Sequence, residues 1–255
     1  MIKSIPDKLW NEIESIFMKK SKVGRPEKDN RIALNGALFI LSTGCQWGML
    51  PEKYGSPSTV HGKFMRWCRN GIFKTILSKA RQYYQARNKK NNWFAIDSIS
   101  KKAPLAQFSG KSPTDRAKRG IKHGLIVDRK GAPLFVTISA ANTHDSKLFL
   151  PLVQQIKKSK NLRIIAADSA FDVKELYQFC KDNKNIALIV TPNPRRKKNV
   201  HRFKVPHRWI VEQTFGILTW FRGLKICWNK TIESAFGYLQ FACSLRLFKM
   251  AGIFG

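Results

Sequence analysis

Acidic residues are scarce in this sequence. It has 16 Asp and Glu against 47 Lys and Arg, which leaves a net charge of +31 on 255 residues. An ordinary metabolic enzyme needs no such excess, and so basic a chain repels itself unless a polyanion neutralises it. A structural protein of the ribosomal type and a membrane-surface binder are the alternatives. However, 43% hydrophobic residues, with 17 Phe and 7 Trp, suffice for one or two packed domains. The composition therefore predicts a folded protein that binds a polyanion, most commonly nucleic acid.

The sequence also lacks a C-x-x-C pair, a signal-peptide core and a long hydrophobic run. Its five cysteines lie far apart, which argues against a zinc site and a disulfide framework and predicts reduced core residues. A charged amphipathic stretch follows the first residues, and Asn35, Gly36, Gln46 and Gly48 interrupt the most apolar early run, 32–50. These absences predict a cytoplasmic protein with no membrane partner.

The N-terminal third has the pattern of a basic helical domain. Six acidic residues lie at or before Glu52 and the next is Asp97, while the segment between them has ten basic residues. Helical spacing predicts helices near 9–17, 32–41 and 72–84, and another that starts with Ser58 as its N-cap. The outer face of the helix after Ser58 would carry His61, Lys63, Arg66 and Arg69. Residues 1–88 are thus predicted to form a helix-turn-helix-like DNA-binding domain, with a helical lid or dimerisation unit as the alternative.

Residues 89–255 have the pattern of an α/β domain. Apolar runs of strand length lie at 93–96, 121–127, 133–139, 162–167 and 186–190. Helical spacing occurs at 146–156, 172–180, 207–223 and 231–250. The turn-rich segment 128–131 looks like a hairpin connection. The predicted order is three strands, helix, strand, helix, strand and helices.

Three carboxylates stand out by their positions. Asp97 and Asp168 each directly follow a predicted strand, and ligand sites of α/β sheets gather outside the C-terminal ends of strands. Glu212, on a predicted helix, is the only acidic residue between Asp182 and Glu233. Converging carboxylates repel each other unless cations bind between them, and Mg²⁺ or Mn²⁺ prefers such oxygen ligands. The structural alternatives are a helix N-cap or turn for each Asp and a surface ion pair for the Glu.

Motifs along essentially the whole chain resemble those of one family. The N-terminal motifs are Thr43-Gly44-Cys45-Gln46-Trp47, Leu50-Pro51, Tyr54-Gly55 and Gly71-Ile72-Phe73. The later motifs are Asp97-Ser98, Lys122-His123, Ala141-Asn142-Thr143-His144-Asp145, Asp168-Ser169-Ala170-Phe171-Asp172 and Arg208-Trp209-Ile210-Val211-Glu212. In this order they resemble the DDE transposases of bacterial insertion sequences, specifically the insertion-sequence-five family.

The resemblance implies an RNase H-like catalytic core with a mixed sheet flanked by helices, in residues 89–255. It implies an enzyme that cleaves at terminal inverted repeats and joins the 3′-hydroxyl ends to target DNA. Asp97, Asp168 and Glu212 would be the catalytic triad and would bind two Mg²⁺ or Mn²⁺ ions. The partner would be double-stranded DNA, at transposon ends and target, bound by a homodimer or higher assembly at the nucleoid. A catalytically silent DNA-binding descendant and a nuclease of the same fold are the alternatives.

Further residues are candidates for DNA contact. Arg208, one helical turn before Glu212, would contact a phosphate near the cut, with an i,i+4 salt bridge to Glu212 as the alternative. His144 and Asp145 would support the site or form a structural turn. The remaining candidates for DNA contact are Lys122, His123, Lys63, Arg66, Arg69, Arg195 and Arg196.

Overall fold

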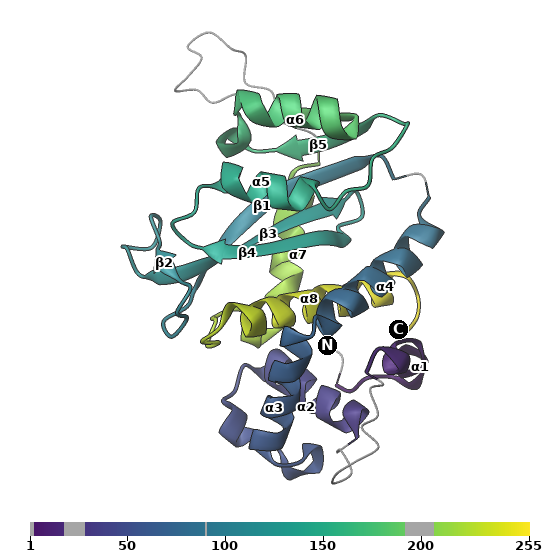
Figure 1. Ribbon diagram of the computed structural model, residues 1–255, viewed down its shortest axis with the longest axis vertical. Helices are drawn as coiled ribbons and strands as arrows, with labels where there is room; N and C mark the ends of the chain where they lie inside the picture. The colour runs from purple at the N-terminus through teal and green to yellow at the C-terminus, as the bar shows by residue number, and fades with distance from the viewer. Residues whose placement is uncertain (1–2, 18–28, 90, 192–206) are drawn as a thin grey trace. The chain divides into compact units, whose positions relative to one another are not determined.

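A computed structural model of the protein describes residues 3–17, 29–89, 91–191 and 207–255 (Figure 1). The chain divides into two compact units. Residues 1–87, 105–107 and 218–255 form the first unit, and residues 88–104 and 108–217 form the second. The predicted division after residue 88 grouped the C-terminal segment with the α/β domain, whereas the structure groups 218–255 with the N-terminal helices.

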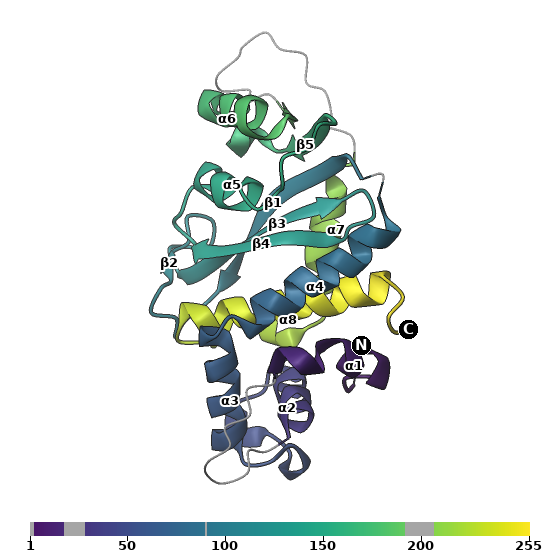
Figure 2. The ribbon, with the colours of Figure 1, turned by 45° about the vertical axis from the view of Figure 1, so that its right-hand side comes forward.

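The first unit is helical. Its helices are α1 (Asp7–Phe17), α2 (Asn30–Thr43), α3 (Pro57–Arg69), α4 (Ile72–Arg87) and α8 (Ile232–Met250), with short 3-10 turns η1 (Trp47–Met49), η2 (Glu52–Tyr54) and η4 (Arg222–Leu224). Helix α8 packs along α4 (Figure 2). It is buried on nearly all sides, as expected of a helix that is apolar all round. No helix within the described ranges is long and apolar enough to span a membrane.

Local sequence signals set the ends of these helices. Asp29 caps α2 by accepting the N–H of Ile32, and the helix ends at Gly44, whose φ of +69° suits glycine. The predicted N-cap of the third helix, Ser58, is wrong. Helix α3 begins two residues earlier, with Ser56 as N-cap and Pro57 at the first helical position, where its missing N–H costs nothing.

The second unit is a mixed sheet with helices. Its strands are β1 (Trp93–Lys102), β2 (Gly110–Lys111), β3 (Arg119–Asp128), β4 (Pro133–Ala140), β5 (Arg163–Ala167) and β6 (Ile186–Val190). Its helices are α5 (Asp145–Val153), η3 (Ser169–Phe171), α6 (Lys174–Lys184) and α7 (Trp209–Leu218). The strand order is β2-β3-β1-β5-β6, with β4 also paired to β3. The mixed α/β fold class is confirmed, and the elements follow the predicted order except for the two-residue strand β2, which the sequence did not predict.

The direction of each strand follows from its connection. Strand β3 pairs antiparallel with both β1 and β4, and the predicted hairpin connection joins β3 to β4. There the Asp128 carboxylate accepts the N–H groups of Lys130 and Ala132, and Gly131 adopts a φ of +72°. Strands β5 and β6 run parallel to β1, and α5 and α6 lie in the connections that parallel strands require.

Candidate active site

Asp97 lies within strand β1, just beyond its parallel pairing with β5. That pairing ends at Ala95 and Ala166, so continuing the register brings Asp97 level with Asp168 on the neighbouring strand. The prediction that the first strand stops before Asp97 is wrong, because β1 continues to Lys102 while paired with β3 along its other edge. Asp97 and Asp168 are therefore neighbours across the sheet, at the point where β5 ends and β1 continues.

Asp168 follows β5 directly and caps the short turn η3. One of its carboxylate oxygens accepts the N–H of Ala170 at 2.9 Å. This is the N-cap role that the sequence left open as the structural alternative. The cap uses a single oxygen, so the role of Asp168 as a cap does not conflict with a role as a ligand.

Arg208 contacts both Asp97 and Glu212. Its Nη1 atom lies 2.9 Å from Oε1 of Glu212 and 3.3 Å from Oδ2 of Asp97. The i,i+4 ion pair that was the alternative for Arg208 is thus present, and Asp97 adds a second carboxylate to it. The Glu212 side chain is 53% exposed and that of Asp97 only 17%. Glu212 accordingly lies on the open side of this cluster.

The cluster carries unfavourable negative charge. Burial raises the pKa of Asp97 to about 7. The N–H of Ser98 and the guanidinium of Arg208 counteract this rise, whereas the carboxylates of Asp168 and Glu212 add to it. Burial also raises the pKa of Asp168. Carboxylates that destabilise each other's ionised form in this way favour a cation between them.

A second polar cluster lies beside the first. The Ser98 hydroxyl donates a short hydrogen bond to the Asp145 carboxylate, and Lys122 Nζ lies 2.9 Å from the same carboxylate oxygen. Lys122 also donates to the Thr143 carbonyl at 2.9 Å. The Asp145 charge raises the pKa of Asp168 in addition to the effect of burial. Asp145 therefore lies close enough to the triad for its charge to act on it.

Comparison with known proteins supports the same interpretation. A family model described as "Transposase DDE domain" matches residues 62–244, which is more than half of the chain. The chain belongs to the DDE transposase family. A second model, "Putative transposase of IS4/5 family", matches residues 5–77. The predicted family is confirmed, and with it the identity of this enzyme as a DNA transposase.

Two curated relatives of this transposase come from Burkholderia cepacia. The chain is 28% identical over 145 residues, 54% of this chain and 67% of the relative, to "Putative transposase for insertion sequence element IS402". It is 32% identical over 121 residues, 43% of this chain and 80% of the relative, to "Insertion element IS402 uncharacterized 16.2 kDa protein". A solved structure, a pre-cleavage Mos1 transpososome, is 12% identical with a TM-score of 0.27 over 91% of this chain and 81% of that chain.

Two predicted DNA contacts of the transposase core are buried instead. Lys122 is 8% exposed and binds Asp145 and Thr143, so its charge is already neutralised within the unit. His123 is 4% exposed, and burial, aided by the charge of Lys101, lowers its pKa to about 3. His123 is therefore neutral at physiological pH. Both side chains are thus buried in this structure, and a DNA contact by either of them stays a prediction.

His144 has both a structural and an accessible side. It is the N-cap of α5, where its Nδ1 atom interacts with the Ser146 hydroxyl at 2.8 Å and accepts the Ser146 N–H. The structural turn expected as one role of this segment is thus present. The residue is exposed, so a DNA contact from the rest of the ring stays a prediction.

The predicted basic face of α3 is only partly correct. Arg66 and Arg69 are exposed, but Lys63 is 4% exposed and donates to the Asn30 side chain at 2.7 Å. The prediction that Lys63 faces outward is wrong. Lys63 follows the buried Val60 by three residues, so the two side chains lie on the same, buried face of the helix. Arg195 and Arg196 lie outside the described residues.

Proposed function

We propose that this transposase cleaves DNA at the terminal inverted repeats of an insertion sequence and joins the 3′-hydroxyl ends to target DNA. Asp97, Asp168 and Glu212 are the catalytic carboxylates and hold two Mg²⁺ or Mn²⁺ ions. One observation carries the proposal. Arg208 links Asp97 to Glu212, while the strand register brings Asp97 level with Asp168.

The chemistry of the donor set fits divalent metal ions. Within the described residues, no three His, Cys, Asp or Glu side chains stand close enough together to form a metal site. Three carboxylates are nevertheless the hard oxygen ligands that Mg²⁺ and Mn²⁺ prefer. In the structure the Arg208 guanidinium forms ion pairs with both Asp97 and Glu212. When bound, such ions would activate the attacking oxygen and stabilise the leaving oxygen of a phosphodiester displacement.

Each protein group then has a distinct role. Asp97 is fixed on β1 by a hydrogen bond from the adjacent Ser98 N–H, 2.7 Å long, and Asp168 is fixed as the cap of η3. Arg208 is free to hold a DNA phosphate once cations have replaced it between the carboxylates, because its planar guanidinium suits phosphate oxygens. Asp145 positions the site through Ser98, and Lys122 holds Asp145 in place.

The DNA partner is double-stranded, and the enzyme acts on it as a homodimer or higher assembly that pairs two ends. Exposed Arg66 and Arg69 on α3 support phosphate contact by the helical unit, and exposed His144 supports contact beside the triad. A contact from Arg195 and Arg196 remains part of the proposal on sequence grounds alone. The net charge of +31 favours tight, salt-sensitive binding to DNA.

Strand transfer tests the proposal. The protein is incubated with Mg²⁺, DNA carrying the element's inverted repeats and a supercoiled target plasmid, and joined products are counted. Asp97→Asn should abolish joining, whereas Asp182→Asn, which removes the same charge from an exposed position on α6, should leave it unchanged. DNA binding with neither cutting nor joining would identify a silent descendant. Cutting without joining would identify a nuclease.

A further inference from the structure

The turn between β3 and β4 contacts the helix that carries Glu212. Thr214 lies on α7, two residues after Glu212, and is 1% exposed. Its hydroxyl oxygen lies 3.1 Å from the carbonyl oxygen of Gly131 and 2.9 Å from that of Ile210, one turn earlier in α7. Because Thr214 and Gly131 are 83 positions apart in the chain, this is a tertiary contact between the turn and α7.

The backbone of the turn packs directly against Thr214. A Cβ atom placed on Gly131 would lie 2.9 Å from the Thr214 Oγ1 atom, and the φ of +72° at this position also favours glycine. The turn itself is held by the Asp128 carboxylate, which accepts two of its backbone N–H groups. Helix α7 therefore packs against a turn whose own conformation is fixed.

A second attachment lies at the start of α7. The ring of His207, two residues before the helix, meets that of Trp93 edge-on, with centroids 5.8 Å apart. Trp93 begins strand β1, and the Arg129 guanidinium of the β3–β4 turn lies 5.8 Å from its ring centroid. Such contacts between a cation and an aromatic ring are attractive. The start of α7, the start of β1 and the turn therefore contact one another around the Trp93 ring.

Glu212 lies between these two attachments and on the other side of the helix. Residues two positions apart in an α-helix project about 200° apart, so Thr214 and Glu212 lie on roughly opposite sides of α7. The Glu212 side chain is 53% exposed and pairs with Arg208 at 2.9 Å. Because the attached side of α7 is fixed by backbone and ring contacts, it sets the distance from Glu212 to the strand that carries Asp97.

We propose that Thr214 is a positioning residue. Its hydroxyl, bound to the Gly131 carbonyl, holds α7 in the position from which Glu212 joins the other two catalytic carboxylates around the metal ions. The inference deepens the proposed function, since it rests on these carboxylates holding Mg²⁺ or Mn²⁺. Partners that orient a metal ligand typically contribute about 10–100-fold to metal affinity or activity. The alternative is a hydroxyl that bonds only to its own helix, through the Ile210 carbonyl, and leaves Glu212 unaffected.

The Mg²⁺ requirement of strand transfer tests this role. Thr214→Val keeps the shape of the side chain and removes its hydroxyl. It should raise the Mg²⁺ concentration for half-maximal strand transfer on the order of tenfold and leave DNA affinity in EDTA unchanged. Thr214→Ser, which keeps the hydroxyl, should behave as the unsubstituted protein does. Gly131→Ala should also raise the Mg²⁺ requirement, because the added Cβ pushes the turn away from the Thr214 hydroxyl.

Amide hydrogen exchange tests the attachment of α7 without metal or catalysis. The full-length protein is exchanged in EDTA, and peptides are analysed by mass spectrometry. Thr214→Val should speed exchange in peptides that cover 209–218, because a lost tertiary contact makes local opening of the helix easier. Exchange in β3 and β5 should stay as in the unsubstituted protein. Thr214→Ser should again show no change.

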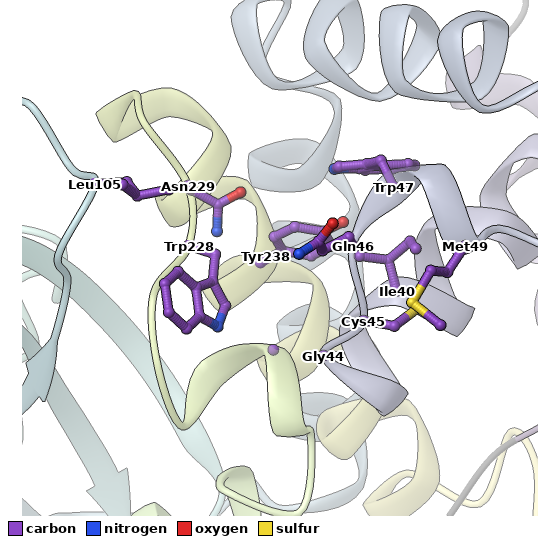
Figure 3. Close-up of a pocket in the computed structure, with 11 residues that line it drawn as sticks. Ile40, Gly44, Cys45, Gln46, Trp47, Met49, Leu105, Trp228, Asn229 and Tyr238 are labelled. Carbon is purple, nitrogen blue, oxygen red and sulfur yellow. The ribbon is translucent and has the colours of Figure 1, made fainter.

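Two buried hydroxyls on α8 provide matched controls. Ser244 is 0% exposed and donates to the Phe241 carbonyl of its own helix at 2.7 Å. Tyr238 is 3% exposed and lines a cavity of the helical unit (Figure 3), and its hydroxyl has no hydrogen-bond partner among the described residues. Ser244→Ala and Tyr238→Phe should change neither the Mg²⁺ requirement nor the exchange of α7. A shift in these controls equal to that of Thr214→Val would assign its effect to a general loss of stability and overturn the proposal.

Two further results would contradict the positioning role. Unchanged exchange of α7 in Thr214→Val would show that the hydroxyl serves only its own helix. Faster exchange with an unchanged Mg²⁺ requirement would show that α7 is attached at Thr214 but that Glu212 does not depend on the attachment. Absence of strand transfer in the unsubstituted protein would instead contradict the proposed function, on which the role rests, while the exchange experiment would still decide whether Thr214 anchors α7.

Discussion

Lys122 and Asp145 form an ion pair of 2.9 Å between β3 and the first turn of α5. The side chains are 10% and 27% exposed, and the same Asp145 oxygen accepts the Ser98 hydroxyl next to Asp97. The sequence suggested two separate roles, a DNA contact for Lys122 and a turn for Asp145. In the structure the two residues bind each other. Asp145 ties the start of α5 to strand β1, which carries Asp97.

Removing this lysine should reduce stability more than DNA affinity. Lys122→Met leaves the Asp145 carboxylate partly buried without its cation, which should lower the free energy of unfolding by about 2–3 kcal/mol in urea titrations. Lys147→Met, at an exposed position on α5, should change it by less than about 0.5 kcal/mol. The salt dependence of DNA binding should match that of the unsubstituted protein. A shallower dependence would instead mean that Lys122 contacts a phosphate.

Arg208→Ala should lower the rate of strand transfer much more than DNA affinity. If Arg208 holds a phosphate whose charge grows in the transition state, its loss should slow joining by roughly 10²–10³-fold, as for other removed electrostatic donors. Single-turnover rates at saturating DNA would measure this. Lys181→Ala, exposed on α6, is the control for loss of one positive charge. A rate unaffected by Arg208→Ala would reduce the residue to an i,i+4 ion pair worth about 0.3–0.5 kcal/mol.

Local sequence patterns predicted the helices and strands of this fold better than the contacts between them. Apolar runs identified the five main strands, because periodicity is a local property of the chain. Strand β1 extends past Asp97 because β3 pairs with 94–102, an antiparallel contact that no local pattern contains. The grouping of α8 with the N-terminal helices also depends on distant contacts. The sequence of a helix that is apolar on all sides does not indicate which other helices or strands it packs against.

The triad could be proposed from sequence, but its surroundings could not. Asp97 and Asp168 follow apolar runs and Glu212 stands alone among basic residues, so position alone raised them as candidates. The pairing of Lys122 with Asp145 bridges 23 positions and became visible only in the structure. The one local signal is that Lys122 lies within the predicted strand 121–127, because a charge inside a buried strand is usually paired.

Helix α3 carries two exposed cations that we propose to bind DNA and one buried cation that holds the fold. Arg66→Ala and Arg69→Ala should each reduce the slope of log affinity against log salt by about 0.9, the contribution of one neutralised phosphate on duplex DNA. Lys63→Met should leave the slope unchanged, because the buried Lys63 ammonium binds Asn30. Titrations at several salt concentrations would measure these slopes. An equal effect of all three substitutions would contradict the difference in burial.

Asp97 should make the metal-free protein less stable as the pH rises. Its pKa is raised by burial to about 7 from an ordinary value of 3.8, so the unfolded chain loses the proton first. The folded state then binds more protons between these values, and stability falls as the pH increases from about 4 to about 7. Since one pKa unit corresponds to about 1.4 kcal/mol, the full cost above pH 7 is on the order of 4 kcal/mol. Burial of Asp168 acts in the same direction.

Asp97→Asn separates this effect from other titrations. In EDTA the substituted protein should melt at a higher temperature than the unsubstituted one at pH 8, and the two melting temperatures should converge near pH 4. Mg²⁺ should raise the melting temperature of the unsubstituted protein at pH 8, because an ion that binds only the folded state stabilises it. It should have little effect on Asp97→Asn. Equal stabilisation of both by Mg²⁺ would place the ion elsewhere, and Asp97 would then be a buried carboxylate without a metal-binding role.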